Sequence, residues 1–149
     1  MSEKPTIGFI GVGFMGHGMA SNILKNGYPL MIKGNQNRAP IDDLVRKGAV
    51  EADSIATLVK SSEIIHLCLS NSSQVENVLE GPGGIIENAR TGVIIIDTST
   101  SDPQSSPFNL IVPRMVFRYA VAVAGHDDLS TTWVRGLEAE GADMVYRYF

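Results

Sequence analysis

The chain has 149 residues, a formal net charge of −4 and 44% hydrophobic residues, which is the composition of one ordinary globular domain. The acidic balance argues against a nucleic-acid-binding surface, which needs a basic stripe, and no apolar run approaches the 18 residues of a membrane span. The single cysteine, Cys68, excludes an intramolecular disulfide and a cysteine-based zinc site. Because residues 1–5 carry no basic-then-apolar leader, we expect a cytoplasmic protein.

The first twenty-odd residues predict a strand, a glycine turn and a helix. Residues 7–10 form a short apolar run. The helix is indicated by apolar residues that recur at helical spacing, namely Met19, Ala20, Ile23 and Leu24. Between strand and helix stands a GxGxxG motif, made of Gly11, Val12, Gly13, Phe14, Met15 and Gly16. In this context the spacing is typical of dinucleotide binding.

Each glycine of the motif has its own physical reason. Gly11 permits a tight turn off the strand, Gly13 lets the backbone approach a pyrophosphate, and Gly16 leaves room for the helix to pack on the strand. The free N–H groups of the helix's first turn, reinforced by the helix dipole, then form an anion site. The alternative is an ordinary glycine-rich turn in an α/β domain.

The loop after a second predicted strand, at residues 28–32, bears on the choice of cofactor. In α/β domains that bind dinucleotides, an acidic residue at the end of the second strand binds the ribose 2′-hydroxyl of NAD, whereas a basic residue at that place accommodates the 2′-phosphate of NADP. No carboxylate occurs between residues 3 and 42. Lys33 and Arg38 bracket the place, and Asn35 can donate a hydrogen bond. Since a guanidinium suits a phosphate, the loop favours NADP, with NAD as the second choice. The alternative is a solvated loop whose basic residues contact nothing.

Strands and short helices continue to alternate along the chain. Further strands are predicted at residues 49–51, 64–69 and 93–97. Helices are predicted at residues 39–47, 55–60 and 74–79. Such alternation predicts a doubly wound, mainly parallel sheet, which is a Rossmann-type α/β fold.

Two of these helices have recognisable ends. Asp42 and Asp43 suit the positive end of the helix over residues 39–47, and Ser54 is the expected N-cap of the helix that follows. The apolar face of the first of these helices is expected to consist of Ile41, Leu44 and Val45.

Polar loops follow two buried strands at their carboxyl ends, at residues 70–73 and 98–103. Ligands of open α/β sheets bind at those ends, so both loops should face one crevice. Residues 70–73 are a candidate cofactor contact, and they can equally cap the next helix. His66, inside the buried strand, is expected to be a hydrogen-bonded core residue rather than a catalytic one.

A set of further motifs accompanies the glycine turn. They are Asn22 after the helix start, Gly48-Ala49, then Val75, Val78, Leu79, Gly81 and Gly84, and finally Ile95, Ile96, Asp97, Ser99, Thr100 and Pro103. With these motifs, residues 6–103 resemble the β-hydroxyacid dehydrogenase family. That family contains 3-hydroxyisobutyrate dehydrogenase, 6-phosphogluconate dehydrogenase, tartronate semialdehyde reductase and glyoxylate reductases.

The resemblance implies a role for particular positions. Cofactor contacts are implied at the pyrophosphate-binding turn and in the later loops, namely at Val12, Phe14, Met15, Leu69, Ser70, Gln74 and Thr100. Ser99 matches a serine near the substrate carboxylate. Two departures occur: Ser70 replaces a proline, and the Asn-Arg pair common in NADP-using members is displaced to Asn35 with Arg38 three residues later.

The chemistry implied by the resemblance is hydride transfer between NADP(H) and a small β-hydroxy acid or aldehyde, with a lysine as general acid/base. The chain has five lysines, Lys4, Lys25, Lys33, Lys47 and Lys60. None is expected at the carboxyl ends of the strands, where the nicotinamide would lie. No catalytic residue is therefore predicted within the chain.

Residues 104–149 depart from the family pattern. Pro107 and Pro113 break the helix expected there, and the substrate-holding motif Asp-Ala-Pro-x-Ser-Gly-Gly is not found. A strand is expected at residues 116–124, a helix at 131–140 and a strand at 144–146. We therefore expect one nucleotide-binding domain over residues 1–149, internally deleted or replaced after residue 104 and lacking the family's C-terminal helical domain.

Three hypotheses of function follow from the sequence. The first is a family oxidoreductase that is weak or inactive alone, and the second is a non-catalytic dinucleotide-binding module or partner subunit. The third is a truncated product that folds poorly. In each case an apolar face left uncovered by the missing helices would favour self-association, whereas no nucleic acid or membrane partner is expected.

Overall fold

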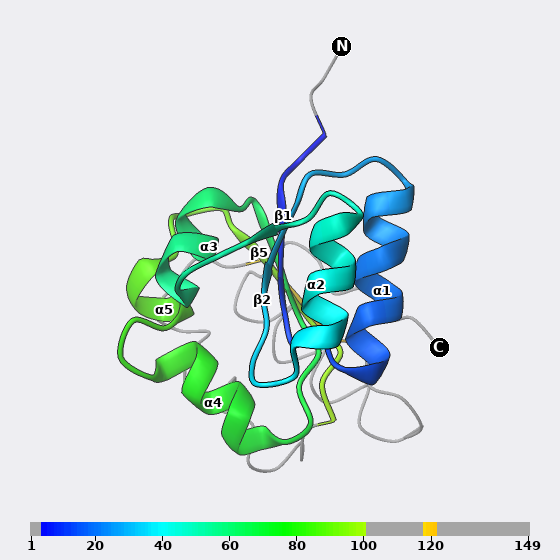
Figure 1. Ribbon diagram of the computed structural model, residues 1–149. Helices are drawn as coiled ribbons and strands as arrows, with labels where there is room; N and C mark the ends of the chain where they lie inside the picture. The colour runs from blue at the N-terminus through cyan, green and yellow to red at the C-terminus, as the bar shows by residue number, and fades with distance from the viewer. Residues whose placement is uncertain (1–3, 101–117, 122–149) are drawn as a thin grey trace.

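The computed structural model describes residues 4–100 and the backbone of residues 118–121, and these build a six-stranded parallel sheet (Figure 1). The strands are β1 Ile7–Ile10, β2 Leu30–Lys33, β3 Val50–Glu51, β4 Ile64–Leu67, β5 Ile94–Asp97 and β6 Arg118–Val121. Their order in the sheet is β3-β2-β1-β4-β5-β6, so the chain winds outward from β1 first in one direction and then in the other. The predicted Rossmann-type fold is confirmed.

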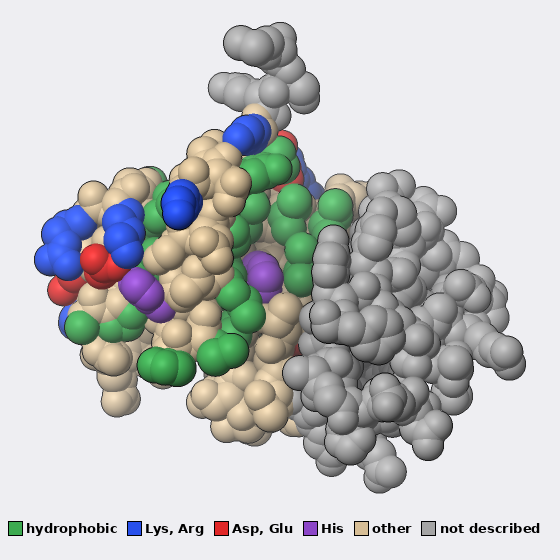
Figure 2. Space-filling view, turned by 90° about the vertical axis from the view of Figure 1, so that its right-hand side faces the viewer, with side chains coloured by type: hydrophobic (Ala, Val, Ile, Leu, Met, Phe, Trp, Pro, Cys, Tyr) green, Lys and Arg blue, Asp and Glu red, His purple; other side chains and the backbone are tan. Residues whose placement is uncertain are grey.

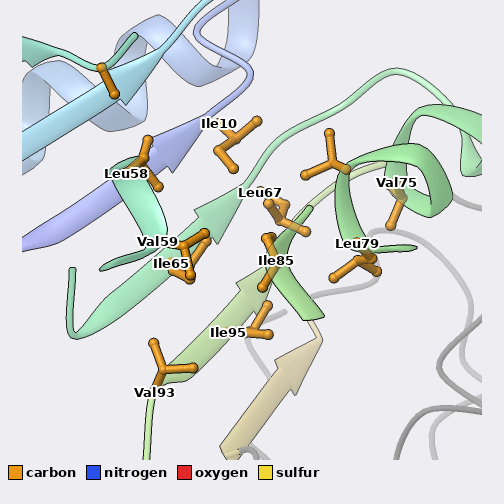
Figure 3. Close-up of a cluster of buried hydrophobic side chains, with 12 residues drawn as sticks. Ile10, Leu58, Val59, Ile65, Leu67, Val75, Leu79, Ile85, Val93 and Ile95 are labelled. Carbon is orange, nitrogen blue, oxygen red and sulfur yellow. The ribbon is translucent and has the colours of Figure 1, made fainter. Parts of the chain in front are cut away.

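Helices cover both faces of this sheet. They are α1 Phe14–Lys25, α2 Arg38–Arg46, α3 Ile55–Ser61, α4 Ser72–Glu80 and α5 Ile85–Asn88. Alternate strand side chains point to opposite faces, so Phe9 and Ile32 pack with α1 and α2, whereas Ile65 and Leu67 pack with α3, α4 and α5. Figure 3 shows the second of these two clusters, with Leu58 and the side chains around it. Burial on both faces explains why the strands are continuous apolar runs.

Polar side chains define where most of the helices begin. Ser54 accepts a hydrogen bond from the N–H of Thr57 at 3.1 Å, so its predicted role as the N-cap of α3 is confirmed. Asn71 caps α4 in the same way, which confirms the capping role foreseen for the 70–73 loop. Asn37 caps α2, which consequently begins at Arg38, one residue earlier than predicted.

Two expectations for α2 are wrong. Asp42 and Asp43 lie beyond its first turn, and they bind basic side chains instead of the helix's free N–H groups. Val45 is 42% exposed and lies off the buried stripe, which holds Ile41 and Leu44. Ile41 and Leu44 pack into the cluster that contains Phe9 and Ile32, whereas Val45 is not part of it.

The ends of two strands also differ from prediction. β2 begins at Leu30, and Pro29 just before it accepts a hydrogen bond from Ile7 through its carbonyl. β4 ends at Leu67 instead of residue 69, because Leu69 donates its N–H to a side chain beyond β5 and leaves the ladder to β1.

β6 falls within the predicted strand at 116–124. The predictions for residues 104–114, 131–140 and 144–146 lie outside the described residues. No helix among the described residues has the length and apolar character needed to cross a membrane.

Candidate functional site

The glycine turn after β1 lies against the backbone that follows β4. Gly11 has a φ of +97°, and a Cβ added there would lie 2.2 Å from the carbonyl oxygen of Cys68. A side chain at this position would therefore be both strained and blocked. At Gly16 a Cβ would lie 2.0 Å from the Gly11 carbonyl oxygen and 3.1 Å from the ring of Phe9. The tight turn at Gly11 and the close helix–strand packing at Gly16 are as predicted.

The N-terminus of α1 is open to an anion. No side chain caps it, and no acidic residue occupies its first turn. Helix geometry leaves the N–H groups of Phe14, Met15 and Gly16 without an intrahelical partner. A Cβ placed on Gly13 would meet nothing within 4 Å, so the backbone there faces open space. This arrangement suits a pyrophosphate, whose negative oxygens need N–H donors and close backbone approach. Val12 can offer only its backbone, because its side chain is buried.

The loops after β4 and β5 are bonded to each other beside this turn. The N–H of Leu69 donates to the hydroxyl oxygen of Ser99 at 2.8 Å, and the N–H of Thr100 donates to the carbonyl oxygen of Leu69 at 3.1 Å. Asp97, which is 4% exposed, accepts the N–H of Ser99. A Cβ on Gly11 would lie 2.9 Å from the Leu69 side chain. The structure thus brings Leu69, Ser99 and Thr100 together next to the glycine turn.

Ser70 and Gln74 lie at the start of α4, Ser70 just before its cap Asn71 and Gln74 in its first turn. The side-chain oxygen of Gln74 accepts a hydrogen bond from the backbone N–H of Ser70 at 3.1 Å. The backbone N–H of Gln74 donates to the side-chain oxygen of Asn71 at 3.0 Å. Both Ser70 and Gln74 are exposed. Their predicted contact with a nucleotide stays a prediction, as do those of the other site residues.

The three residues predicted to select NADP lie on the other side of β1, and two of them are engaged within the protein. The Lys33 ammonium donates to the carbonyl oxygens of Asp53 at 2.9 Å and Ala52 at 3.3 Å. Lys33 ends β2, so the expectation that no lysine lies at a strand's carboxyl end is wrong for this residue. It lies beside β3, and β5, which Ser99 follows, is three strands away from β2 in the sheet. Asn35 is exposed in the loop that follows.

Arg38 binds two carboxylates. It forms a bidentate pair with Glu51, at 2.6 and 2.9 Å, and a third hydrogen bond to Asp42 at 2.9 Å. The hydrogen bonds that Arg38 donates to Glu51 and then to Asp42 raise the pKa of Arg38, and the bonds that Glu51 accepts from Arg38 lower the pKa of Glu51. Glu51 and Asp42 were not foreseen as partners of this arginine. The pairing of β2 with β3 is the signal that could have found Glu51, because it brings the ends of both strands to one edge.

His66 is the hydrogen-bonded core residue that the sequence predicts. Its ring stacks on Phe9 at 4.5 Å, and its Nε2 lies 3.1 Å from the hydroxyl oxygen of Thr98. The Thr98 hydroxyl donates to the Leu67 carbonyl at 2.9 Å, so the imidazole nitrogen must be the donor in the contact between His66 and Thr98. Burial lowers the pKa of His66 to about 4.

Charged side chains gather on the outer surface of α1 and α2. Asp43 binds His17 on α1 at 2.7 Å, and it also binds Lys47 and Arg46 near the end of α2. The hydrogen bond from Lys47, followed by that from His17, lowers the pKa of Asp43.

Figure 2 shows charged and histidine side chains clustered on one part of this face, and a band of hydrophobic side chains next to the residues not described. Self-association through an uncovered apolar face stays a prediction. Within residues 4–100, no three His, Cys, Asp or Glu side chains cluster as a metal site would require.

Most of the chain is similar in sequence to known proteins. The family described as the NAD binding domain of 6-phosphogluconate dehydrogenase matches residues 6–107. The uncharacterized oxidoreductase YkwC of Bacillus subtilis is 41% identical over 100 residues, which are 67% of this chain and 34% of that protein. The probable mitochondrial 3-hydroxyisobutyrate dehydrogenase of Dictyostelium discoideum is 38% identical over 109 residues, or 70% of this chain and 32% of that protein.

Solved structures show the same fold. The 3-hydroxyisobutyrate dehydrogenase of Mycobacterium tuberculosis, with L-serine, superposes with a TM-score of 0.70 at 17% identity, over 97% of this chain and 54% of that one. The chain spans about a third of the length of the curated relatives it matches.

Proposed function

Since the chain belongs to the family of the NAD binding domain of 6-phosphogluconate dehydrogenase, among the β-hydroxyacid dehydrogenases, we propose that it binds NADP(H) for hydride transfer with a small β-hydroxy acid or aldehyde. NAD(H) is the alternative cofactor. The nicotinamide supplies the hydride when bound, and the protein supplies position and electrostatics. One observation carries the proposal: the glycine turn, the open N-terminus of α1 and the bonded loops after β4 and β5 meet at one edge of the sheet.

We assign the parts of the dinucleotide to different strands along this edge. The N–H groups of Gly13, Phe14, Met15 and Gly16 would hold the pyrophosphate. The adenosine ribose would lie toward the end of β2, because the pyrophosphate would lie between β1 and β4 and the first half of such folds binds the adenosine. The residues proposed around the ribose are Lys33, Asn35 and Arg38. The residues proposed along the nicotinamide half are Leu69, Ser70, Gln74 and Thr100.

Ser99 is the proposed contact to the substrate carboxylate. Its oxygen accepts the N–H of Leu69, so its hydroxyl hydrogen is left to donate in another direction. The backbone of Ser99 is held as well, because its own N–H donates to the buried Asp97. A hydroxyl fixed in this way is suited to orient a carboxylate, as positioning residues must.

We further propose that this chain by itself turns over its substrate weakly or not at all. All five lysines lie within the described residues, and none lies at the ends of β4 or β5. Lys33 ends β2, and its ammonium is bound to two backbone carbonyls. The lack of a positioned acid/base typically costs about 10²–10⁴-fold in rate. The same observation favours the second candidate, a non-catalytic dinucleotide-binding module or a subunit that pairs with a complete partner.

Binding and turnover assays separate these proposals. NADPH and NADH are titrated by fluorescence, and 3-hydroxyisobutyrate, glyoxylate and succinic semialdehyde are then tested for turnover. Binding with slow turnover supports the first proposal, and binding without turnover supports the second. Rapid turnover would contradict the argument from the lysines. If neither nucleotide binds at millimolar concentration, both proposals fail.

A further inference from the structure

The Arg38 side chain is held by two carboxylates at the place where the proposed cofactor's ribose would lie. Glu51 accepts hydrogen bonds from both terminal nitrogens of the guanidinium, at 2.6 Å and 2.9 Å, and Asp42 accepts one more at 2.9 Å. Paired, charge-assisted hydrogen bonds of this kind are the strongest that a guanidinium makes with a carboxylate. Any phosphate that uses Arg38 must therefore compete with Glu51.

The sheet places Glu51 at this edge. Glu51 is the second residue of β3 and pairs with Ile32 of β2, one residue before Lys33 ends that strand. Its carboxylate is thus presented from the strand next to β2, which has no acidic residue of its own. The side chain of Glu51 is about one-third exposed, so ligand can reach this edge.

The charges around this position cancel. Lys33 and Arg38 are positive, and Glu51 and Asp42 are negative, so a 2′-phosphate would meet no net positive charge. To bind the guanidinium, the phosphate would either displace Glu51 or lie beside it and be repelled. A ribose 2′-hydroxyl faces neither penalty, because it carries no charge and can donate a hydrogen bond to a carboxylate.

We propose that Glu51 determines the cofactor preference of this site, supplying from β3 the carboxylate that β2 lacks and restraining Arg38 from the 2′-phosphate of NADP. The inference rests on the proposed function, which places the dinucleotide's ribose at the end of β2. If Glu51 acts in this way, the presence of Arg38 by itself does not predict whether the site prefers NADP or NAD. The chain should consequently distinguish NADPH from NADH only weakly, although it carries the basic residues expected of an NADP-binding loop.

The experiment measures dissociation constants for NADPH and NADH, by fluorescence titration, in the wild type and in matched variants. Glu51→Gln keeps the shape of the side chain and removes its charge. It should tighten NADPH by about two- to fivefold, the range for a partly exposed ion pair, and leave NADH unchanged or weaker. The gain should shrink in high salt, because exposed charges are screened. Asp42→Asn, which removes one hydrogen bond instead of two, should give a smaller gain.

Two further variants test the mechanism. In the double variant Arg38→Ala/Glu51→Gln the gain for NADPH, relative to Arg38→Ala alone, should be much smaller, because the guanidinium is gone and only the direct repulsion of the phosphate is relieved. Glu80→Gln, an exposed residue at the far end of α4, is the matched control and should change neither constant. Thermal melting of each variant shows whether it folds, and Asp42→Asn supplies the test if Glu51→Gln does not.

The outcomes separate this inference from the proposed function. If the wild type binds NADH but Glu51→Gln leaves the ratio of the two constants unchanged, the inference is overturned and the dinucleotide site stands. A gain that is equally large without Arg38 also overturns it. If the wild type binds neither nucleotide, the proposed function fails and the inference fails with it.

Discussion

Acid should destabilise the fold through His66 before it affects the carboxylates. Burial keeps the pKa of His66 at about 4 in the folded chain, against 6.5 for a free histidine. Between these two pH values the imidazole of His66 is protonated in the unfolded chain and remains neutral in the folded chain. The free energy of unfolding must therefore fall as the pH drops from about 6.5 to about 4, and His66 contributes nothing above pH 6.5.

The magnitude follows from the two pKa values. Lowering the pH from 7.5 to 5 should remove about 2 kcal/mol from the free energy of unfolding, and the full difference between the pKa values corresponds to about 3 kcal/mol. The pKa values of Asp43 and Glu51 are lowered in the fold, so their contributions are lost only below their unfolded values, near pH 4. The window from pH 6.5 to 5 thus isolates histidine.

Urea unfolding at several pH values between 7.5 and 5 measures this effect. His66→Gln removes the titrating ring and keeps an amide that can donate to Thr98, so its stability should change much less over this range. His17→Gln, which removes a histidine at the surface of α1, is the matched control and should keep most of the wild-type slope. An equal slope in the wild type and in His66→Gln would refute the reasoning.

Three other substitutions follow from the packing. Gly16→Ala would place a Cβ 2.0 Å from the Gly11 backbone, so it should cost about 1–3 kcal/mol of stability in urea unfolding and abolish nucleotide binding in titrations; unchanged binding would contradict the packing argument. Ser21→Ala removes a buried hydroxyl that has no partner among the described residues, so it should raise stability in urea by about 0.5–1 kcal/mol, and a loss would show that the hydroxyl is satisfied. Ser54→Ala deletes the cap bonded to the Thr57 N–H and should lower stability in urea by about 1 kcal/mol; no loss would show that the cap is dispensable.

The elements that the sequence predicts well are those set by local patterns. Parallel strands buried on both faces are continuous apolar runs, so β1, β4 and β5 are recognisable without knowledge of their neighbours. The glycine turn is recognisable from its spacing after β1, although the contact that excludes a side chain at Gly11 comes from Cys68, far along the chain. Ser54 predicts the start of α3 because an N-cap side chain accepts a hydrogen bond from the backbone N–H only three residues later in the chain.

The side-chain contacts between segments that are distant in the chain could not be predicted from the sequence. Arg38 could be placed at the end of β2, but its bond to Glu51 depends on the pairing of β2 with β3. Asp43 could be assigned to a helix start, but its partner His17 comes from a different helix. The bond between His66 and Thr98 likewise needs β4 and β5 in register. Of these pairs, the one between Arg38 and Glu51 lies at the proposed site and shifts the pKa of both side chains, so the electrostatics there could not be predicted from the motif alone.

Amide NMR during a nucleotide titration tests the central claim most directly, because it reports where on the chain the dinucleotide binds. The account predicts that NADPH and NADH shift the amide signals at the sheet's carboxyl edge, those of Gly13, Phe14, Met15, Leu69 and Thr100. Signals at the opposite edge, such as those of Glu63 and Gly92, should not move. Shifts confined to that opposite edge, or none at millimolar nucleotide, would contradict the account.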